Sequence, residues 1–364
     1  MTIPARRVVV VGAGVAGLTV TATLAAAGLD VLCLEARDRI GGRVLSVDVA
    51  GGSLDLGATW FWAGERRVQN LAAELGVQTF EQHCAGAALF DHPAGVLRLD
   101  DNPIDVAAGR YTAGAHSLTR ALASTIPAPS IQRSSPVTSI TTDPTGLLVD
   151  TATGASHAAH VVLAIPPALA ATTIDMRPGL PNRLLRLAQS TPVWMGAITK
   201  IVVQYPDAFW RRQGLAGTAV SLLGPLRELH DMSGPHGNPA ALFGFTTDMT
   251  PDTVNMNTRV LSQLVRLYGP EAADPIRIIL QDWSREAFTL PAGVEPSTNY
   301  ALFGHSLYAT PTFDGRLHWA ATETSSVHPG RVEGAIAAAL RATQAILANL
   351  NGPRQKDYTE VGRH

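Results

Sequence analysis

The sequence predicts an α/β fold, in which a mostly parallel sheet forms one domain and a mixed or antiparallel sheet forms an inserted α+β domain. Three observations predict this arrangement. A βαβ pattern opens the chain, a second group of strand-like runs follows between residues 136 and 167, and stretches rich in proline and glycine separate the later segments. Such stretches are typical of a second domain inserted between pieces of the first.

The opening pattern is a compact βαβ unit. Val8–Val11 is a β-branched run, as expected for a parallel strand covered on both faces. Residues 17–27 are small and alanine-rich, which predicts a helix that packs closely on that strand, and Gly28 then ends the helix. A second strand is predicted at Val31–Leu34.

Later segments are predicted with less detail. Strand-like runs between residues 136 and 167 end at Pro166 and Pro167, another strand follows Lys200, and residues 332–350 form one helix. Residues 86–130, 206–260 and 284–316 are rich in proline and glycine and carry no clear period. We assign residues 1–75, 131–175 and 305–350 to a discontinuous nucleotide-binding domain, residues 76–130 and 176–304 to a substrate domain, and residues 351–364 to a polar tail.

Composition limits the partners. The chain has 364 residues, 46% of them hydrophobic and 16% charged, which is typical of a protein with a large core. Its formal net charge is −2 without a basic block, which argues against nucleic acid or an anionic membrane surface as partner. Arg341 interrupts the last apolar stretch, so that stretch is predicted not to span a membrane. With two cysteines, Cys33 and Cys84, the sequence favours the cytoplasm, and a homodimer stays open.

The turn after the first strand carries a nucleotide-binding motif. Residues 12–17 read G-x-G-x-x-G, with Ala16 before the last glycine. Gly12 permits the tight turn, Gly14 lets a pyrophosphate approach the backbone, and Gly17 brings helix and strand together. Glu35 follows Gly17 by eighteen residues, close to the ~20 expected of the carboxylate that binds ribose hydroxyls. A carboxylate there disfavours NADP, but this motif alone does not separate FAD from NAD.

Residues 35–44 distinguish FAD from NAD. They include Glu35, Ala36, Arg37, Gly42 and Arg43. The segment resembles the extended fingerprint of the flavin-containing amine oxidase superfamily, which includes monoamine oxidases, polyamine oxidases and L-amino acid oxidases. The resemblance implies a Rossmann-like FAD-binding domain of the two-dinucleotide-binding type. A second glycine pair flanked by arginines adds backbone N–H groups and positive charge along the long cofactor.

Four more segments resemble the same superfamily in the same order along the chain. Residues 55–60 are similar to the segment that passes the flavin ring, the strand at Val137 to the one beside the adenine, and residues 321–325 and 330–335 to two C-terminal motifs. The cofactor contacts implied by these segments are Gly57, Ala58, Thr59, Val137, Thr322, Glu323 and Val332. The backbone of Val332, at a helix N-terminus, is implied to face the flavin and to stabilise its reduced form.

Lys200 is the candidate catalytic residue. It lies in a segment, residues 199–205, that is similar to the strand bearing the lysine of this superfamily, where the lysine holds a water beside the flavin and assists the reaction with oxygen. A buried lysine is costly unless it has such a role, and the alternative is a surface lysine on an edge strand. Trp60 and Trp283 are candidate pocket residues, and a core tryptophan is the alternative for Trp283.

The chain departs from the superfamily at the substrate side. Arg331 stands where monoamine oxidases have one tyrosine of an aromatic cage, and Gly293 stands at the other. Ala292 replaces the cysteine that links FAD covalently, so we expect non-covalent FAD. Arg331 could bind a substrate carboxylate, and the alternative is an arginine that faces solvent or pairs with a glutamate. His328 is a further pocket candidate, and the histidines lack metal spacing, so no metal is expected.

These observations predict a FAD-dependent oxidoreductase that converts an amine or amino acid into an imine and then into an aldehyde or ketone plus ammonia, with oxygen reduced to hydrogen peroxide. One alternative is a flavin-dependent dehydrogenase or desaturase in a biosynthetic pathway, although desaturases commonly lack the lysine. A more remote alternative is a FAD-bound module without turnover.

Overall fold

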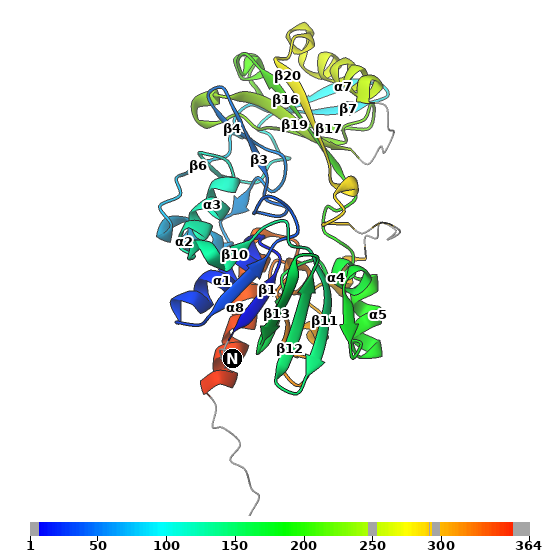
Figure 1. The fold of residues 1–364 in the computed structure, drawn as a ribbon. Helices are drawn as coiled ribbons and strands as arrows, with labels where there is room; N and C mark the ends of the chain where they lie inside the picture. The colour runs from blue at the N-terminus through cyan, green and yellow to red at the C-terminus, as the bar shows by residue number, and fades with distance from the viewer. Residues whose placement is uncertain (1–6, 247–252, 291, 293–298, 352–364) are drawn as a thin grey trace, which may run out of the picture.

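The computed structural model describes residues 7–246, 253–290, 292 and 299–351. Two halves lie one above the other in Figure 1, with an N-terminal sheet and its helices below and a larger sheet above. None of the helices in the described residues is long and apolar enough to cross a membrane.

The lower half is built on a five-stranded parallel sheet, which confirms the predicted Rossmann-like unit. Its strand order is β10-β2-β1-β14-β21, and the strands are β1 (Val8–Val11), β2 (Val31–Leu34), β10 (Ile131–Gln132), β14 (His160–Leu163) and β21 (Leu317–Trp319). Side chains alternate across β1, so Val8 and Val10 face one hydrophobic core while Val9 and Val11 face another. Burial on both faces explains why this strand reads as an unbroken apolar run.

Helices cover one face of this sheet. They are α1 (Val15–Ala26), α2 (Arg66–Glu74), α3 (His116–Ser124) and α8 (Val332–Asn351). The predicted first helix begins two residues earlier than expected, so Gly17 lies in its first turn. Small residues of α1 allow α8 to pack beside it.

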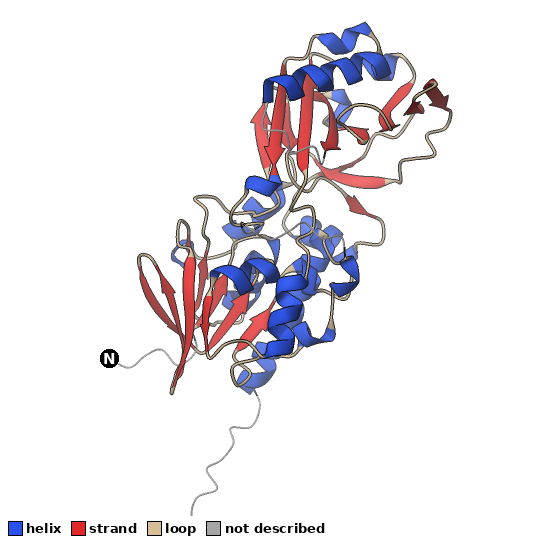
Figure 2. Ribbon diagram, turned by 90° about the vertical axis from the view of Figure 1, so that its right-hand side faces the viewer, coloured by secondary structure: helices blue, strands red, loops and turns tan. Residues whose placement is uncertain are grey.

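The opposite face carries a four-stranded sheet and two short helices (Figure 2). The strands, in the order β13-β12-β11-β15, are β11 (Val137–Asp143), β12 (Gly146–Thr151), β13 (Gly154–Ala158) and β15 (Asp175–Arg177). The helices are α4 (Pro167–Thr173) and α5 (Asn182–Ser190). Pro167 starts α4, so the proline pair that was expected to end a strand also opens a helix.

The upper half is a seven-stranded mixed sheet, as the sequence predicts. In the order β20-β16-β19-β18-β17-β7-β8, its strands are β7 (Ala87–His92), β8 (Gly95–Leu99), β16 (Thr199–Tyr205), β17 (Leu215–Ser221), β18 (Glu228–Asp231), β19 (Ala240–Thr246) and β20 (Arg277–Asp282). Only the β17–β7 pair is parallel. Helix α7 (Thr253–Tyr268) packs on one face through Val260 and Leu264, against Ile201 and Val203 of β16.

Smaller elements connect the halves. They are the hairpin β3 (Ser46–Val49) and β4 (Gly52–Asp55), the sheet of β5 (Phe61–Trp62), β6 (Thr79–Glu81) and β9 (Ala108–Tyr111), and helix α6 (Phe209–Arg212). Leu54 at the end of β4 packs against Val202 and Phe243 of the large sheet. The hairpin therefore fixes the two halves against each other.

Two segments pack differently from their assigned domains. Residues 116–124 and 182–190 were assigned to the substrate domain, but Leu118 of α3 and Leu184 of α5 are buried in the cores of the lower half. Amphipathic helices of this length can cover either sheet, and only the packing distinguishes the two. We therefore propose that both helices belong to the nucleotide-binding half.

Candidate active site

A cavity of about 1010 Å³ runs between the two halves. Most of the predicted site residues line it: Gly12, Gly14, Ala16, Glu35, Ala36, Arg37, Gly42, Arg43, Gly57, Ala58, Thr59, Trp60, Val137, Lys200, Trp283, Thr322, Arg331 and Val332. Three predicted residues, Gly17, Glu323 and His328, are not part of its lining. Segments more than 300 residues apart in the chain thus meet around one space.

The glycine turn at one end of the cavity requires glycine for steric reasons. Gly12 has a φ of +99°, which residues with a side chain rarely adopt. A Cβ on Gly17 would lie 1.8 Å from the carbonyl oxygen of Gly12, so Gly17 serves the contact between helix and strand. Gly14 caps α1, and no side chain caps the first amides of that helix. The turn is therefore open to an anion at the positive end of the helix dipole.

Glu35 is buried beside this turn. One carboxylate oxygen accepts a hydrogen bond from the backbone N–H of Ala13 at 2.7 Å, and the other accepts from that of Arg37 at 2.9 Å. These bonds fix the carboxylate at the cavity wall, where its remaining lone pairs can accept ribose hydroxyls. The Arg37 guanidinium itself pairs with Glu286 at 2.9 Å.

Arg43 and Glu323 form a bidentate pair across the cavity wall. The two nitrogens of Arg43 contact the two carboxylate oxygens at 2.5 and 3.1 Å, and the Trp194 N–H donates to the same carboxylate at 3.2 Å. Glu323 is fully buried and lies behind the lining. Its role in this structure is to hold Arg43, which lines the cavity.

Helix α8 begins at the cavity. Val332 is its first residue, and the hydroxyl of Thr322 donates to the carbonyl oxygen of Arg331 at 2.7 Å, which fixes the approach to the helix. The N–H groups of this first turn carry partial positive charge. The predicted contact between the Val332 backbone and the flavin stays a proposal that this geometry supports.

Lys200 lies on β16, between β19 and β20, and is 1% exposed. The alternative of a surface lysine on an edge strand is therefore wrong. Its ammonium nitrogen Nζ donates to the carbonyl oxygen of Gly57 at 3.0 Å and to the hydroxyl of Thr59 at 2.6 Å, and it lies 4.3 Å from the ring centre of Phe243. Burial lowers the pKa of Lys200 to about 7, with Asp55 raising it and Arg110 lowering it further.

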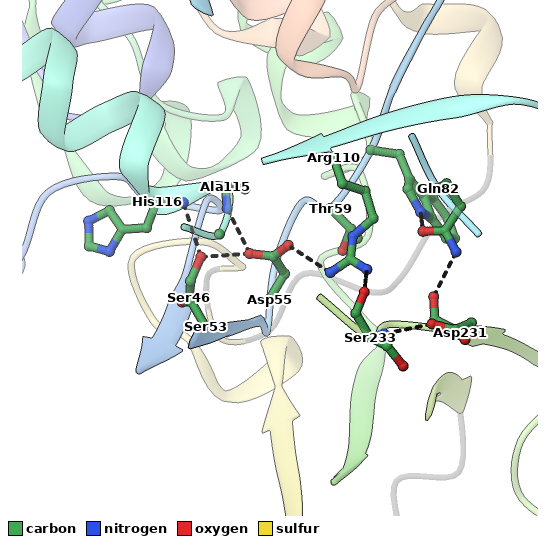
Figure 3. A network of polar contacts seen from close by, with 12 residues as sticks. Ser46, Ser53, Asp55, Thr59, Gln82, Arg110, Ala115, His116, Asp231 and Ser233 are labelled. Atoms are coloured by element: carbon green, nitrogen blue, oxygen red, sulfur yellow. Dashed lines mark hydrogen bonds and ion pairs between the residues drawn. The ribbon is translucent and has the colours of Figure 1, made fainter. Parts of the chain in front are cut away.

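A network of polar side chains supports the segment that holds Lys200 (Figure 3). Asp55, two residues before Gly57, accepts hydrogen bonds from the hydroxyl of Ser46 at 2.7 Å and the N–H of Ala115 at 2.8 Å. Its second oxygen lies 3.9 Å from Arg110, which donates to the carbonyl oxygen of Ser233 at 2.7 Å. Arg110 is 2% exposed and connects the segment to the large sheet. Sequence reasoning missed it, because residues 86–130 carry no motif.

Three tryptophans shape the cavity near Lys200. Trp60 donates to Gln82 at 3.0 Å, and Trp283, 4% exposed, donates to the carbonyl oxygen of Leu56 at 3.0 Å. Trp283 is both buried in the core and part of the cavity lining, so the two interpretations of this residue do not exclude each other. Trp194 also lines the cavity and was not foreseen. It lies in a loop two residues after Pro192, where no pattern marked it.

The two remaining pocket candidates are Arg331 and His328. Arg331 reaches the cavity wall, but its guanidinium pairs with buried Glu65 at 3.1 Å and stacks 4.2 Å from the ring centre of Trp62. This is the glutamate-paired alternative. His328 is exposed in a loop and is not part of the cavity lining. Gly293 lies outside the described residues, while Ala292 lines the cavity.

A family model described as flavin-containing amine oxidoreductase matches residues 88–347, and one for an NAD(P)-binding Rossmann-like domain matches residues 10–75. The chain belongs to the flavin-containing amine oxidase family. It is therefore a FAD-dependent oxidoreductase that acts on amines.

Relatives match over nearly the whole chain. A probable flavin-containing monoamine oxidase A of Dictyostelium discoideum is 25% identical over 93% of this chain and 97% of its own length. A putative flavin-containing monoamine oxidase of Mycobacterium tuberculosis is 28% identical over 94% and 97%. The solved structure of putrescine oxidase bound to putrescine has a TM-score of 0.84 at 21% identity and covers 94% of this chain and 99% of that one, which shows a shared fold.

The residues present fit FAD. The open glycine turn suits its pyrophosphate, buried Glu35 suits a ribose, and the cavity continues from there to Lys200. The sequence holds two cysteines, and neither lines the cavity: Cys33 is buried in β2, and the Cys84 thiol contacts the carbonyl oxygen of Gln82 at 3.5 Å. Neither thiol is therefore placed to link FAD covalently, which agrees with the expectation drawn from Ala292.

Proposed function

We propose that this enzyme is an oxidase, which passes the electrons of the amine to oxygen. An amine with an α-hydrogen loses two hydrogens to become an imine, oxygen gains them to become hydrogen peroxide, and water hydrolyses the imine to an aldehyde or ketone plus ammonia. FAD, when bound, supplies the redox chemistry by accepting a hydride equivalent and returning two electrons.

The observation that carries the proposal is the placement of Lys200. Its Nζ is held by Gly57 and Thr59 at the cavity wall, and burial brings its pKa to about 7. At neutral pH this nitrogen can both hold a proton and release one, so it can hold a water and provide positive charge where oxygen is reduced.

Other residues prepare the site for an amine. Trp60 and Trp283 exclude water from the wall beside Lys200, and the N-terminus of α8 stabilises negative charge at the opposite side. No acid–base triad is needed, because a neutral amine requires only desolvation and orientation. A dehydrogenase or desaturase with another electron acceptor is the second candidate, favoured by no specific contact.

The test uses the purified yellow holoprotein. We expect amines to bleach the flavin without oxygen and to release one peroxide per amine with oxygen. Lys200→Met should slow flavin reoxidation at least about tenfold while FAD binding changes little. Bleaching without peroxide would support the dehydrogenase, and equal loss of reoxidation and FAD binding would contradict the role of Lys200.

A cytoplasmic location and a homodimer remain predictions from the sequence. Sedimentation of the holoprotein measures its oligomeric state, and fractionation of the source cells measures its location.

A further inference from the structure

The large sheet presents a row of three side chains toward the cavity. Lys200 on β16 is paired in register with Phe245 on β19, and Phe245 is paired with Glu228 on β18. Directly paired residues project from the same face of a sheet, and all three residues line the cavity. Two strand spacings separate Lys200 from Glu228, which places the backbones of the two residues on the order of 10 Å apart across the sheet.

Glu228 is held from behind by a buried histidine. The imidazole Nε2 of His230 contacts one carboxylate oxygen of Glu228 at 2.9 Å, and its Nδ1 contacts Asp105 at 2.9 Å. Asp105 also accepts a hydrogen bond from Asn102 at 2.7 Å and one from Thr218. His230 is 6% exposed and packs edge-on against Trp60 with 4.9 Å between ring centres. The carboxylate therefore has a fixed orientation.

His230, Asp105 and Glu228 together carry one negative charge. Hydrogen bonds to Asp105 and Glu228 outweigh burial and raise the pKa of His230, while the bond from His230 lowers the pKa of Glu228. Both ring nitrogens of His230 face carboxylate oxygens, which accept hydrogen bonds when ionised, so the contacts fit an imidazolium between two carboxylates, and these three groups sum to −1. The second oxygen of Glu228 makes no hydrogen bond with the described residues, and its side chain is 53% exposed. The neighbouring Arg227 also lines the cavity, and its guanidinium donates to the carbonyl oxygen of Leu222 at 2.6 Å and not to Glu228.

We propose that Glu228, oriented by His230 and Asp105, binds a second cationic nitrogen of the substrate, which makes diamines or polyamines the preferred substrates. This inference rests on the proposed oxidase function of the same cavity. The reacting nitrogen lies at the Lys200 end, the alkyl chain packs on the ring of Phe245, and the distal ammonium contacts the free oxygen of Glu228. Arg331, whose charge is already paired with Glu65, offers no comparable site for a carboxylate.

The test compares 1,4-diaminobutane with butylamine as substrates of the holoprotein. We expect Glu228→Gln to lower kcat/KM for the diamine about 10- to 100-fold and that for butylamine less than about 3-fold. Glu271→Gln is the matched control, since Glu271 is an exposed glutamate of the same half that pairs with Arg212. Equal losses for both substrates would overturn the proposal.

The positioning role of Asp105 has its own readout. Asp105→Asn should raise KM for the diamine with little change in kcat, and Asp105→Glu should restore part of the loss. Calorimetric binding of 1,4-bis(trimethylammonio)butane, which carries no oxidisable amine, should weaken in Glu228→Gln and not in Glu271→Gln.

The outcomes separate this inference from the function on which it rests. If neither amine bleaches the flavin, the proposed function fails while dication binding still tests Glu228. If butylamine is oxidised as efficiently as the diamine by the wild type, the oxidase function stands and the role of Glu228 is wrong.

Discussion

The two halves of this enzyme differ in how their functional residues are brought together. In the lower half, the glycine turn and Glu35 lie within one βαβ unit, so local sequence places them. In the upper half, Lys200 and Glu228 come from β16 and β18, which are not adjacent in the sheet, and the Asp105 that orients the latter precedes β9. The phosphate turn and its neighbouring carboxylate are thus encoded locally, whereas the proposed substrate-binding residues depend on strand order and register.

This comparison has a direct experimental form. Substitutions in the glycine turn should remove the flavin colour, and substitutions of Lys200 or Glu228 should keep the colour and change turnover. A variant of the substrate sheet that folds and yet loses FAD would break the distinction.

The largest expected effect is that of Gly17→Ala. The added Cβ would lie 1.8 Å from a backbone oxygen that cannot move aside alone, so α1 must shift from β1 and distort the phosphate turn. We expect a colourless protein with stability lowered by about 1–3 kcal/mol. Absorbance at the flavin band and urea unfolding measure both effects. Gly179→Ala is the control, because its Cβ would meet no atom within 4 Å, and a yellow Gly17→Ala protein would contradict the prediction.

A second prediction concerns the Arg43–Glu323 pair. Glu323→Gln leaves Arg43 facing a neutral group in a buried setting, so we expect a loss of about 1–3 kcal/mol in the free energy of unfolding. Glu286→Gln removes the charge opposite Arg37 at a more exposed site, where 29% of the glutamate side chain is accessible, and should cost less than about 1 kcal/mol. Urea unfolding measures the free energy of unfolding of both variants. Equal losses in the two variants would contradict the prediction.

The pH dependence of Lys200 gives a third prediction. Its folded pKa is about 7 and its ordinary value 10.5, so between these values the unfolded chain binds a proton that the folded chain does not. The stability of the wild type relative to Lys200→Met should therefore rise with pH across this window, by up to about 1.4 kcal/mol per pH unit. Below the window, the full cost of burying the charged lysine remains.

Direct titration of the same group is feasible because the chain has two lysines, Lys200 and Lys356. In a Lys356→Arg background, NMR of carbon-13-labelled lysine reports one side chain. A titration midpoint near the ordinary lysine value would contradict the lowered pKa.

The smallest expected effect on substrate choice is that of Arg331→Met. Because Glu65 and Trp62 already engage the guanidinium, its removal should change kcat/KM for amines and for amino acids by similar factors, within about 3-fold of each other. Thermal unfolding serves as the control for the lost ion pair. A selective loss for amino acids would restore the carboxylate-binding interpretation of Arg331.

The sequence predicted much of the nucleotide-binding half, because the steric and hydrogen-bonding requirements of a phosphate turn are met by residues close together in the chain. The run Val8–Val11 predicted a buried parallel strand, Gly12 and Gly14 predicted the phosphate turn, and Glu35 followed at the expected distance. The start of α1 was predicted two residues too late, because glycine is unfavourable in helices and two motif glycines flank its first residues.

The sequence by itself determined that the chain binds a dinucleotide, and its resemblance to a known family determined that the dinucleotide is FAD and that Lys200 is the lysine of interest. Only the tertiary structure decided that Arg331 is paired, that His328 is not part of the cavity lining, that Glu228 lines the cavity, and that Arg110 lies beside Asp55. The physical reason is that a side chain's partner across a sheet depends on register between distant strands, which no local pattern specifies.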